Sequence, residues 1–419
     1  MIAVRALPLS DPLTSPELWH ALRHEHFVWD AYVAGERRVD VHPLVLSPEA
    51  HADALAAVRT TLCALAHTKA LAFGSDSELG TYGLAPTAAR LARASYAAND
   101  ATSLSRIDLL LGEDGRFRPC EINADCPGGL NEADGLPALL GRAGFPGSTF
   151  VSRVVDALAD KLVALSGGRG SPRGMIALAL ATAYSEDLQI AALVERTVRQ
   201  KGGVCERVSP TQLGVREGTC FVGQHPVSVL YRYFPTEHFA ELPVAEALAS
   251  VVARGALRTV SSFADMVAQS KVSFARIHAH LNALPPELAK AVASRIPETR
   301  LASRAPHVAH ERSGWVVKRA LGRVGDEVFV GPLETDEDWT RLCLGASDAS
   351  ASGDPWIVQR FVPQRAIQTP WGPRYLTLGA YTMDNEMLGY FARLSPIVHT
   401  SHDALVVPVV VRSERAGLS

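Results

Sequence analysis

Two short apolar segments joined by a glycine-containing turn constrain the fold of this chain more than any other feature. Residues 106–111 read Arg-Ile-Asp-Leu-Leu-Leu, and residues 116–123 read Arg-Phe-Arg-Pro-Cys-Glu-Ile-Asn. The dipeptide Asp-Gly between them is preferred in two-residue hairpin turns. We therefore predict an antiparallel hairpin in which the turn at 114–115 pairs Glu113 with Arg116.

This register places four functional side chains on one face of the hairpin. Counting back from the turn sets Asp108 opposite Glu121 and Arg106 opposite Asn123. Residues two apart on a strand share a face, and cross-strand neighbours lie about 5 Å apart at Cβ. The four side chains are thus predicted to form one cluster. The prediction depends on this register, since a one-residue slip would place the groups on opposite faces.

The chemistry of the cluster indicates a divalent cation. Asp108, Glu121 and Asn123 offer only oxygen ligands, without histidine or thiolate, which favours Mg²⁺ over zinc. Mg²⁺ usually keeps positions open for substrate phosphates, so a nucleotide is the natural partner, and Arg106 beside it would face a phosphate. The alternative interpretation is a solvated hairpin face with scattered charges.

We predict that the whole chain divides into three units. Residues 1–166 carry the hairpin and predicted helices over 47–71 and 86–97. Residues 172–263 follow a Gly/Ser/Pro-rich linker and alternate apolar strands with helices near 187–200 and 243–254, which predicts a βα unit. Residues 264–419 mix helices with short strands.

A second set of residues is compatible with phosphate binding. Lys318 ends an apolar strand and precedes a loop containing Gly322 and Gly325, which would close over nucleotide phosphates. The order GxxxxGK[ST] of a Walker motif is absent here. Lys271 begins a predicted helix. The alternative for Lys318 and its loop is a surface turn, and the alternative for Lys271 is an exposed lysine on a helix.

Four further residues lie at the ends of predicted strands. Gln359 and Arg360 end the strand near 356–361, where a nucleotide base would meet backbone and amide groups. Arg393 follows the strand near 387–393 and would act as a transition-state clamp or remain a surface charge. Arg232 would bind a substrate carboxylate or phosphate, or form a structural ion pair.

Composition narrows the classes of partner. The 419 residues carry a net charge of −3, without the basic excess that nucleic acid or an anionic membrane requires. The N-terminal segment has no apolar stretch of signal-peptide type, so a cytoplasmic protein is expected. The six cysteines form no CxxC pair, which argues against a zinc site or a disulfide framework.

The order of these motifs resembles the glutathionylspermidine synthase-like family. The resemblance rests on Arg-x-Asp at 106–108, Glu-Ile-Asn-Ala-Asp-x-Pro at 121–127 and Tyr-Arg-Tyr-Phe-Pro at 231–235, followed by the two lysines, Val-Gln-Arg-Phe-Val and a late arginine. It implies an α/β (α+β) chain with a circularly permuted ATP-grasp fold and an inserted βα domain like a pre-ATP-grasp domain. It also implies an enzyme that joins a carboxylate and an amine with ATP and Mg²⁺.

The resemblance implies a role for each candidate residue. The Mg²⁺ ligands would be Asp108, Glu121 and Asn123, and Arg106 and Arg393 would face the acyl-phosphate and the transferring phosphoryl group. The remaining positions would bind nucleotide (Lys271, Lys318, Gly322, Gly325, Gln359, Arg360) or substrate (Arg232, Gly128, Gly129). The loop from Gly322 to Gly325 is the expected lid.

Three departures from the family pattern concern the substrates. Cys126-Pro-Gly-Gly stands where the synthases carry Thr or Ser residues that help hold glutathione, Arg319 replaces a proline, and Leu394 replaces an acidic residue. We therefore expect a small-molecule acid and amine other than glutathione and spermidine. A small-molecule kinase and a degenerate ATP-grasp scaffold are the competing hypotheses.

Overall fold

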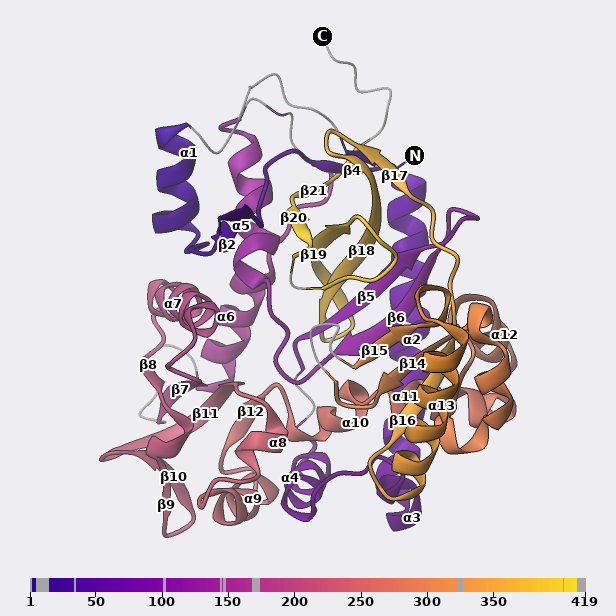
Figure 1. The fold of residues 1–419 in the computed structure, drawn as a ribbon. Helices are drawn as coiled ribbons and strands as arrows, with labels where there is room; N and C mark the ends of the chain where they lie inside the picture. Colours follow the sequence, from indigo (N-terminus) through magenta and orange to yellow (C-terminus); the bar gives the residue numbers. More distant parts are fainter. Residues whose placement is uncertain are drawn as a thin grey trace.

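The central sheet is built from both ends of the chain. The computed structural model describes residues 2–4, 15–33, 35–100, 103–143, 145, 148–167, 174–322, 327–401 and 403–412. Its largest antiparallel sheet has the strand order β20-β19-β18-β5-β6, and β17 pairs with β18 (Figure 1). The strands are β5 (Ser105–Leu111), β6 (Phe117–Asn123), β17 (Ile367–Thr369), β18 (Gly372–Met383), β19 (Glu386–Ser395) and β20 (Leu405–Val407).

The hairpin of β5 and β6 has the predicted pairing at the site but a different turn. Asp108 faces Glu121 and Arg106 faces Asn123, as expected. The two-residue turn pairing Glu113 with Arg116 is wrong, because the Gly112 amide bonds to the Arg116 carbonyl at 2.9 Å. The loop therefore has three residues and ends at Gly115 in the left-handed region, at φ +77°.

A β-bulge restores the register that this longer turn would have shifted. The pairing changes between Asp108 and Leu109, so that Cys120 is an extra residue on β6. Pro119 lies next to it, and β6 is an edge strand, where proline is tolerated because no ladder donor is lost. The register shift from the longer turn and the shift from the bulge cancel. The predicted side chains therefore share one face of the hairpin.

A second sheet forms the βα unit. Its order is β8-β7-β11-β10-β9, with β12 beside β11, and the β8, β7, β11 and β12 strands are parallel. Helix α7 (Ser185–Gln200) connects β7 to β8, and α9 (Ala245–Ala253) precedes β12, which confirms the two predicted helices. The strands are β7 (Met175–Leu180), β8 (Cys205–Val208), β9 (Leu213–Arg216), β10 (Thr219–Val222), β11 (His225–Tyr233) and β12 (Arg258–Val260).

A third sheet lies beside the β5–β6 hairpin. It has the antiparallel order β13-β16-β14-β15, and α13 (Asp336–Ala351) packs against it through a cluster that includes the buried Trp315 and Trp339. Figure 1 shows this sheet and α13 next to β6. The strands are β13 (Thr299–Leu301), β14 (Trp315–Arg319), β15 (Val328–Val330) and β16 (Trp356–Arg360).

Helices and two small sheets complete the described chain. The long α2 begins after Ser47, whose side chain accepts the Ala50 amide as an N-cap. The helices are α1 (Pro16–His20), α2 (Pro48–Gly74), α3 (Asp76–Gly80), α4 (Pro86–Ala97), α5 (Leu130–Leu140), α6 (Val154–Leu165), α8 (Thr236–Phe239), α10 (Met266–Gln269), α11 (Val272–Ala279) and α12 (Pro286–Arg295). The small sheets contain β1 (Ile2–Val4), β4 (Leu44–Leu46) and β21 (Val409–Val411), and β2 (Tyr32–Val33) with β3 (Glu36–Arg37).

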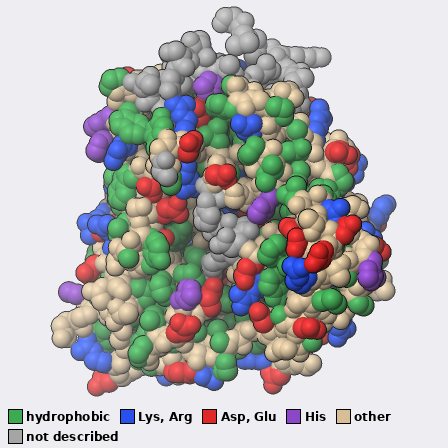
Figure 2. Space-filling model, viewed as in Figure 1, with side chains coloured by type: hydrophobic (Ala, Val, Ile, Leu, Met, Phe, Trp, Pro, Cys, Tyr) green, Lys and Arg blue, Asp and Glu red, His purple; other side chains and the backbone are tan. Residues whose placement is uncertain are grey.

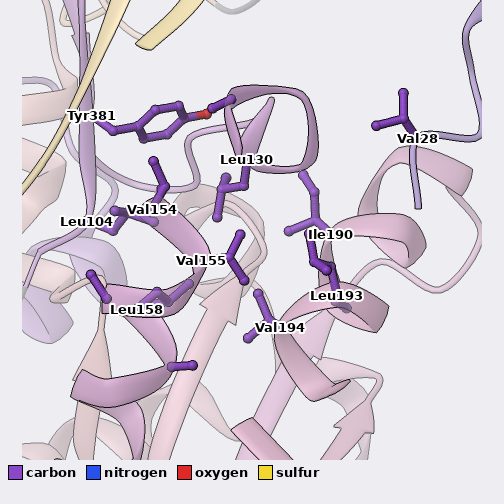
Figure 3. Close-up of a cluster of buried hydrophobic side chains, with 14 of the residues drawn as sticks. Val28, Leu104, Leu130, Val154, Val155, Leu158, Ile190, Leu193, Val194 and Tyr381 are labelled. Carbon is purple, nitrogen blue, oxygen red and sulfur yellow. The ribbon is translucent and has the colours of Figure 1, made fainter. Parts of the chain in front are cut away.

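An apolar core fixes the start of α5 against the central sheet. Leu130 of α5 packs in one cluster with side chains of α6 and α7, and with Tyr381 from β18 (Figure 3). Because Leu130 and Tyr381 are both buried, the residues just before α5 lie beside β18. This packing carries the Gly128-Gly129 segment to the functional face of the hairpin.

The surface agrees with the near-neutral charge balance. On the face viewed in Figure 2, acidic and basic side chains of the described residues are intermixed. Within the described ranges, none of the helices has the length and apolarity needed to cross a bilayer.

Candidate active site

Asp108 is the centre of the charged cluster. Arg106 donates to both of its carboxylate oxygens, from Nε at 2.7 Å and from Nη2 at 3.0 Å. Arg393 of β19 donates at 2.7 Å and Asn123 at 3.1 Å, both to Oδ2. Asp108 is fully buried, so these donors replace the water that its charge would otherwise require.

Glu121 is the more accessible of the two carboxylates. Its Oε1 lies 3.5 Å from Asn123 Nδ2, and its Oε2 lies 3.6 Å from Lys271 Nζ. Burial by itself raises the pKa of Glu121, but the charges of Lys271, Lys318 and Arg393 outweigh burial and lower that pKa. Glu121 is therefore an anion throughout the neutral range.

The two lysines approach β6 from the neighbouring elements. Lys271 stands at the N-cap of α11 and donates to the Gly322 carbonyl at 2.7 Å. Lys318 of β14 donates to the Cys120 carbonyl at 3.1 Å and to Gln359 Oε1 at 2.8 Å. Both lysine side chains are almost fully buried, so α11 and the third sheet deliver positive charge to Glu121.

The first cavity opens between the third sheet and the central sheet. It has about 680 Å³ of empty volume, and valines from both β14 and β15 form part of its wall. Its polar residues include Glu121, Lys318, Gln359, Arg360 and Arg393. The cavity is thus a largely apolar slot whose wall also carries cations, a form that suits a flat heterocycle bearing phosphates.

The second cavity lies on the other side of Glu121 and Arg393. It has about 1090 Å³ of empty volume and a wall rich in charged groups. Among the residues that line it are Arg106, Asn123, Cys126, Gly128, Gly129, Glu132 and Phe391. Glu121 and Arg393 line both cavities, so the two spaces meet at these side chains.

The two glycines before α5 lie in close contact with this face. The Gly128 carbonyl accepts from Arg106 Nη1 at 2.7 Å and from the Tyr381 hydroxyl. Gly129 has φ +89°, and a Cβ there would lie 2.6 Å from the Phe391 ring. Only glycine fits this position, because both the backbone conformation and the ring exclude a side chain.

Similarity to known proteins agrees with this architecture. The family model described as glutathionylspermidine synthase preATP-grasp matches residues 14–412. The chain belongs to this family. No curated protein sequence matches the chain.

A solved structure similar over the whole chain is the apo glutathione synthetase-like effector of Globodera pallida. The match covers 97% of this chain and 100% of that one, with a TM-score of 0.62 and 10% identity. Weaker likenesses are a putative γ-glutamylcysteine synthetase from Methylobacillus flagellatus (TM-score 0.43, 12% identity, 83% and 85% of the two chains) and D-alanyl-alanine synthetase A from Vibrio cholerae (0.35, 13%, 54% and 68%). The family match and the first structure confirm the expected α+β, ATP-grasp fold class.

Within this family member, the structure gathers most of the predicted site residues. Arg106, Asp108, Glu121, Asn123 and Arg393 form one connected cluster. Lys271 and Lys318 flank it, and Gln359 orients Lys318 while also donating to Thr299 Oγ1 at 3.1 Å. Gly322 accepts the Lys271 ammonium, whereas Gly325 lies outside the described residues.

Arg232 is placed differently from the substrate-binding prediction. Its guanidinium is fully buried and forms an ion pair with Asp125 Oδ1 at 2.6 Å. Asp125 also accepts from the Thr236 amide at 2.9 Å and from its hydroxyl at 2.6 Å. Arg232 is not among the described residues that line the two cavities, and its contact with Asp125 is that of a structural ion pair.

Arg360 marks the rim of the first cavity. Its guanidinium lies 4.2 Å from the centre of the Trp315 ring and 3.5 Å from Glu298. The Arg360 side chain is 47% exposed and lies at the opening of the cavity. The side chain of Gln359, the neighbouring residue, is buried. The alternation of side chains along β16 accounts for the difference.

Three site residues carried no signal in the sequence. Tyr381, Phe391 and Glu132 reach the second cavity or its wall from β18, β19 and α5. The Phe391 ring lies 5.2 Å from the Arg106 guanidinium and 5.9 Å from that of Arg393, so it supports both by cation–π contact. An aromatic residue within an apolar strand looks like core, which is why spacing did not single it out.

The oxygen atoms of Asp108, Glu121 and Asn123 suit a divalent cation that binds together with a phosphate group. The Asn123 amide lies within 3.5 Å of both carboxylates, and its nitrogen and oxygen exchange places by a rotation about the terminal bond. Four cations, Arg106, Arg393, Lys271 and Lys318, act on two carboxylates. This excess of positive charge disfavours a bare metal ion and favours a polyphosphate. Among the described residues, no group of three or more His, Cys, Asp and Glu side chains forms a metal cluster.

Proposed function

We propose that the chain is an ATP-dependent ligase that joins a small-molecule carboxylate to an amine and releases ADP and phosphate. One observation carries the proposal: an apolar slot and a charged cavity meet at Glu121 and Arg393. A phosphoryl group passing from a nucleotide in the slot to an acid in the charged cavity would cross at these two residues. Membership of the family supports the same assignment.

The nucleotide would lie in the first cavity. Its base would contact the valines of β14 and β15, with Gln359 and Arg360 at the edge. Lys318 and Lys271 would contact the phosphates, and Gly322, whose carbonyl holds Lys271, begins the loop that we propose as the lid. Asp108, Glu121 and Asn123 would hold Mg²⁺, which supplies charge neutralisation at the phosphates when it is bound.

The acid would be activated by phosphorylation. A carboxylate oxygen attacks the γ-phosphorus, the bond to the β-phosphate oxygen breaks, and ADP leaves with an acyl-phosphate remaining. Arg393 lies where the two cavities meet and Arg106 lines the second cavity, and their charges would stabilise the developing negative charge. The amine then attacks the acyl carbon, and inorganic phosphate leaves.

The substrates differ from glutathione and spermidine in this proposal. Gly128 and Gly129 have no side chains that could bind a substrate, and the Gly128 carbonyl is already bonded to Arg106. Cys126, which also lines the cavity, is a weak hydrogen-bond donor. The part of the wall formed by Cys126, Gly128 and Gly129 would select an acid by its shape and through backbone contacts.

The three predicted units would form an ATP-grasp core and a separate domain. Residues 1–166 and 264–419 share the central sheet, which supports a common ATP-grasp core. Residues 172–263 form the separate pre-ATP-grasp-like sheet, and the Asp125–Arg232 ion pair joins them to the segment that follows β6.

The test is product analysis across a panel of acids and amines. Purified protein is incubated with ATP and MgCl₂, and ADP, phosphate and product masses are recorded for each pair. We expect ADP and phosphate in equal amounts, with an amide that requires both substrates. ADP with a stable phosphorylated acid and no amide would indicate a kinase, and no turnover with any pair would indicate a binding protein.

A further inference from the structure

Glu132 is a carboxylate in the second cavity that the proposed reaction has not used. It lies in the first turn of α5, directly after the Gly128-Gly129 segment. It lines the same cavity as Arg106, Glu121 and Arg393. Its Oε2 atom is buried and has no hydrogen-bond partner among the described residues, which is costly for a carboxylate unless a ligand or a proton supplies one.

The charged groups around Glu132 come from α7 and from the residues just before β2 and just after β3. Glu186 of α7 and Asp30 add negative charge, and Arg38 adds positive charge. The Arg38 charge is shared, because its Nη1 bonds to Glu186 Oε1 at 3.1 Å. On the side of the central sheet, Tyr381 of β18 is near enough for the charge of Glu132 to contribute to raising the tyrosine pKa, which burial raises first.

This environment raises the pKa of Glu132 into the neutral range, where both the protonated and the ionised form are present. Burial raises its pKa to about 7, and Glu186 and Asp30 add to the effect, while its own backbone amide and Arg38 oppose it. A carboxyl group that exchanges its proton near neutral pH is suited to acid–base catalysis.

We propose that Glu132 is the proton acceptor for the amine that attacks the acyl-phosphate, an assignment that rests on the ligase function proposed above. An alkylamine enters as an ammonium ion and cannot attack until it loses a proton. Glu132 takes that proton, the nitrogen lone pair forms the C–N bond, and the bond from the acyl carbon to the phosphate oxygen breaks. The second nitrogen proton leaves with the phosphate, which departs as hydrogen phosphate, and Glu132 returns its proton to water.

The neighbouring carboxylates are less suited to this step. Asp108 has both oxygens bonded to Arg106. Glu121 has a lowered pKa, which makes it a weak base at neutral pH. Glu186 is 61% exposed and paired with Arg38, and the Asp30 carboxylate accepts from Ser185 Oγ at 3.0 Å.

The experiment compares two nucleophiles on one acyl-phosphate. Hydroxylamine is largely unprotonated at neutral pH and needs no base, whereas methylamine arrives as its ammonium ion. With each acid of the panel, hydroxamate and N-methylamide are measured for the wild-type protein, E132Q, E132D and E186Q. The variant E186Q removes a charge from the same cavity without removing the proposed base.

The expected result is a selective loss. E132Q should form N-methylamide about 100-fold more slowly, the low end for loss of a general base, while its hydroxamate rate stays at the wild-type level. E132D should recover part of the methylamide rate. E186Q keeps the base and removes only one of the charges that raise its pKa, so it should change the ratio of the two products far less than E132Q does. With methylamine, the increase of kcat with pH near neutrality should be lost in E132Q.

The two proposals fail in different ways. No hydroxamate from wild-type protein with any acid would overturn the ligase function. Hydroxamate from wild-type protein, combined with an equal loss of both products in E132Q, would overturn only the role of Glu132. Independently, ¹³C NMR of protein labelled at the glutamate carboxyl carbons should show a group titrating near neutral pH that is absent from E132Q. A wild-type spectrum without such a group would overturn the assignment.

Discussion

Arg393 on β19 donates to Asp108 on β5 at 2.7 Å, although β18 lies between the two strands. The contact crosses over Gly379 of β18, which pairs with Asp108 on one side and with Phe391 on the other. The absence of a side chain at Gly379 leaves room for Asp108 and for Arg106, which donates to the same carboxylate. The centre of the site therefore depends on a glycine that carries no chemistry itself.

Gly379→Ala should disable the site more than it destabilises the fold. A Cβ at this position would lie 2.7 Å from Arg106 Cδ and 3.0 Å from Asp108 Oδ1, so the arginine must move. We expect loss of nearly all ATP turnover, with a cost of about 1–3 kcal/mol in the free energy of unfolding. Urea unfolding and ADP release measure the two effects.

The matched control for this change is Gly345→Ala in α13. Nothing lies within 4 Å of a Cβ at Gly345, and alanine is the better helix former by about 1 kcal/mol. Its turnover should equal that of the wild-type protein. Normal turnover in Gly379→Ala would contradict the importance of the Arg106–Asp108 contact.

Glu121→Gln should abolish turnover while the protein remains folded. The glutamate borders both cavities, and loss of one preorganised electrostatic group at a reacting centre costs about 100- to 1,000-fold in rate. ADP release measures turnover, and circular dichroism measures folding. Glu113→Gln, at the far end of the same hairpin, serves as the control, and comparable losses in both variants would count against a special role for Glu121.

Asp125→Ala should be strongly destabilising. It would leave the fully buried Arg232 without its carboxylate partner, and loss of one partner of a buried ion pair costs about 3–5 kcal/mol. Replacing both residues, Asp125→Ala with Arg232→Met, should recover part of that stability because no charge is then left unpaired. Thermal unfolding of the two variants checks this prediction. Equal stability of the Asp125→Ala variant and the wild-type protein would contradict it.

Mg²⁺ should stabilise the protein only together with a nucleotide. Four cations around two carboxylates disfavour a bare divalent ion. MgCl₂ alone should leave the melting temperature unchanged, whereas MgCl₂ with a non-hydrolysable ATP analogue at 100 times its Kd should stabilise by about 2.7 kcal/mol. Differential scanning fluorimetry measures both, and a large shift with Mg²⁺ alone would show that the site holds the metal unaided.

Glu132→Gln should stabilise the protein in alkaline solution. Because the pKa of Glu132 is raised by burial to about 7 in the folded chain, its ionisation opposes folding, and stability falls as pH rises from the unfolded pKa to the folded one. At pH 4 the variant and wild type should unfold alike, and at pH 8 the variant should be more stable by up to about 3 kcal/mol. Chemical denaturation at both pH values checks the sign, and a destabilised variant at pH 8 would contradict it.

The sequence alone determined the composition of the hairpin face. Side chains alternate along a strand with a period of two, so Arg106, Asp108, Glu121 and Asn123 share a face in any register that pairs 108 with 121. The turn was wrongly predicted, yet the bulge at Cys120 restored that register. Pro119 was the available signal for it, because proline inside a strand marks an edge or a bulge.

Only the tertiary structure decided what meets this face. The interior position of Arg232 depends on Asp125, 107 residues earlier in the chain, and no local pattern distinguishes a buried arginine from a substrate-binding one. Arg393 lies near Asp108 because β18 pairs with both β5 and β19. Glu132 faces the cavity only because α5 packs on α6, α7 and Tyr381. Strand periodicity is local and visible in the sequence, whereas these contacts depend on the packing of segments far apart in the chain.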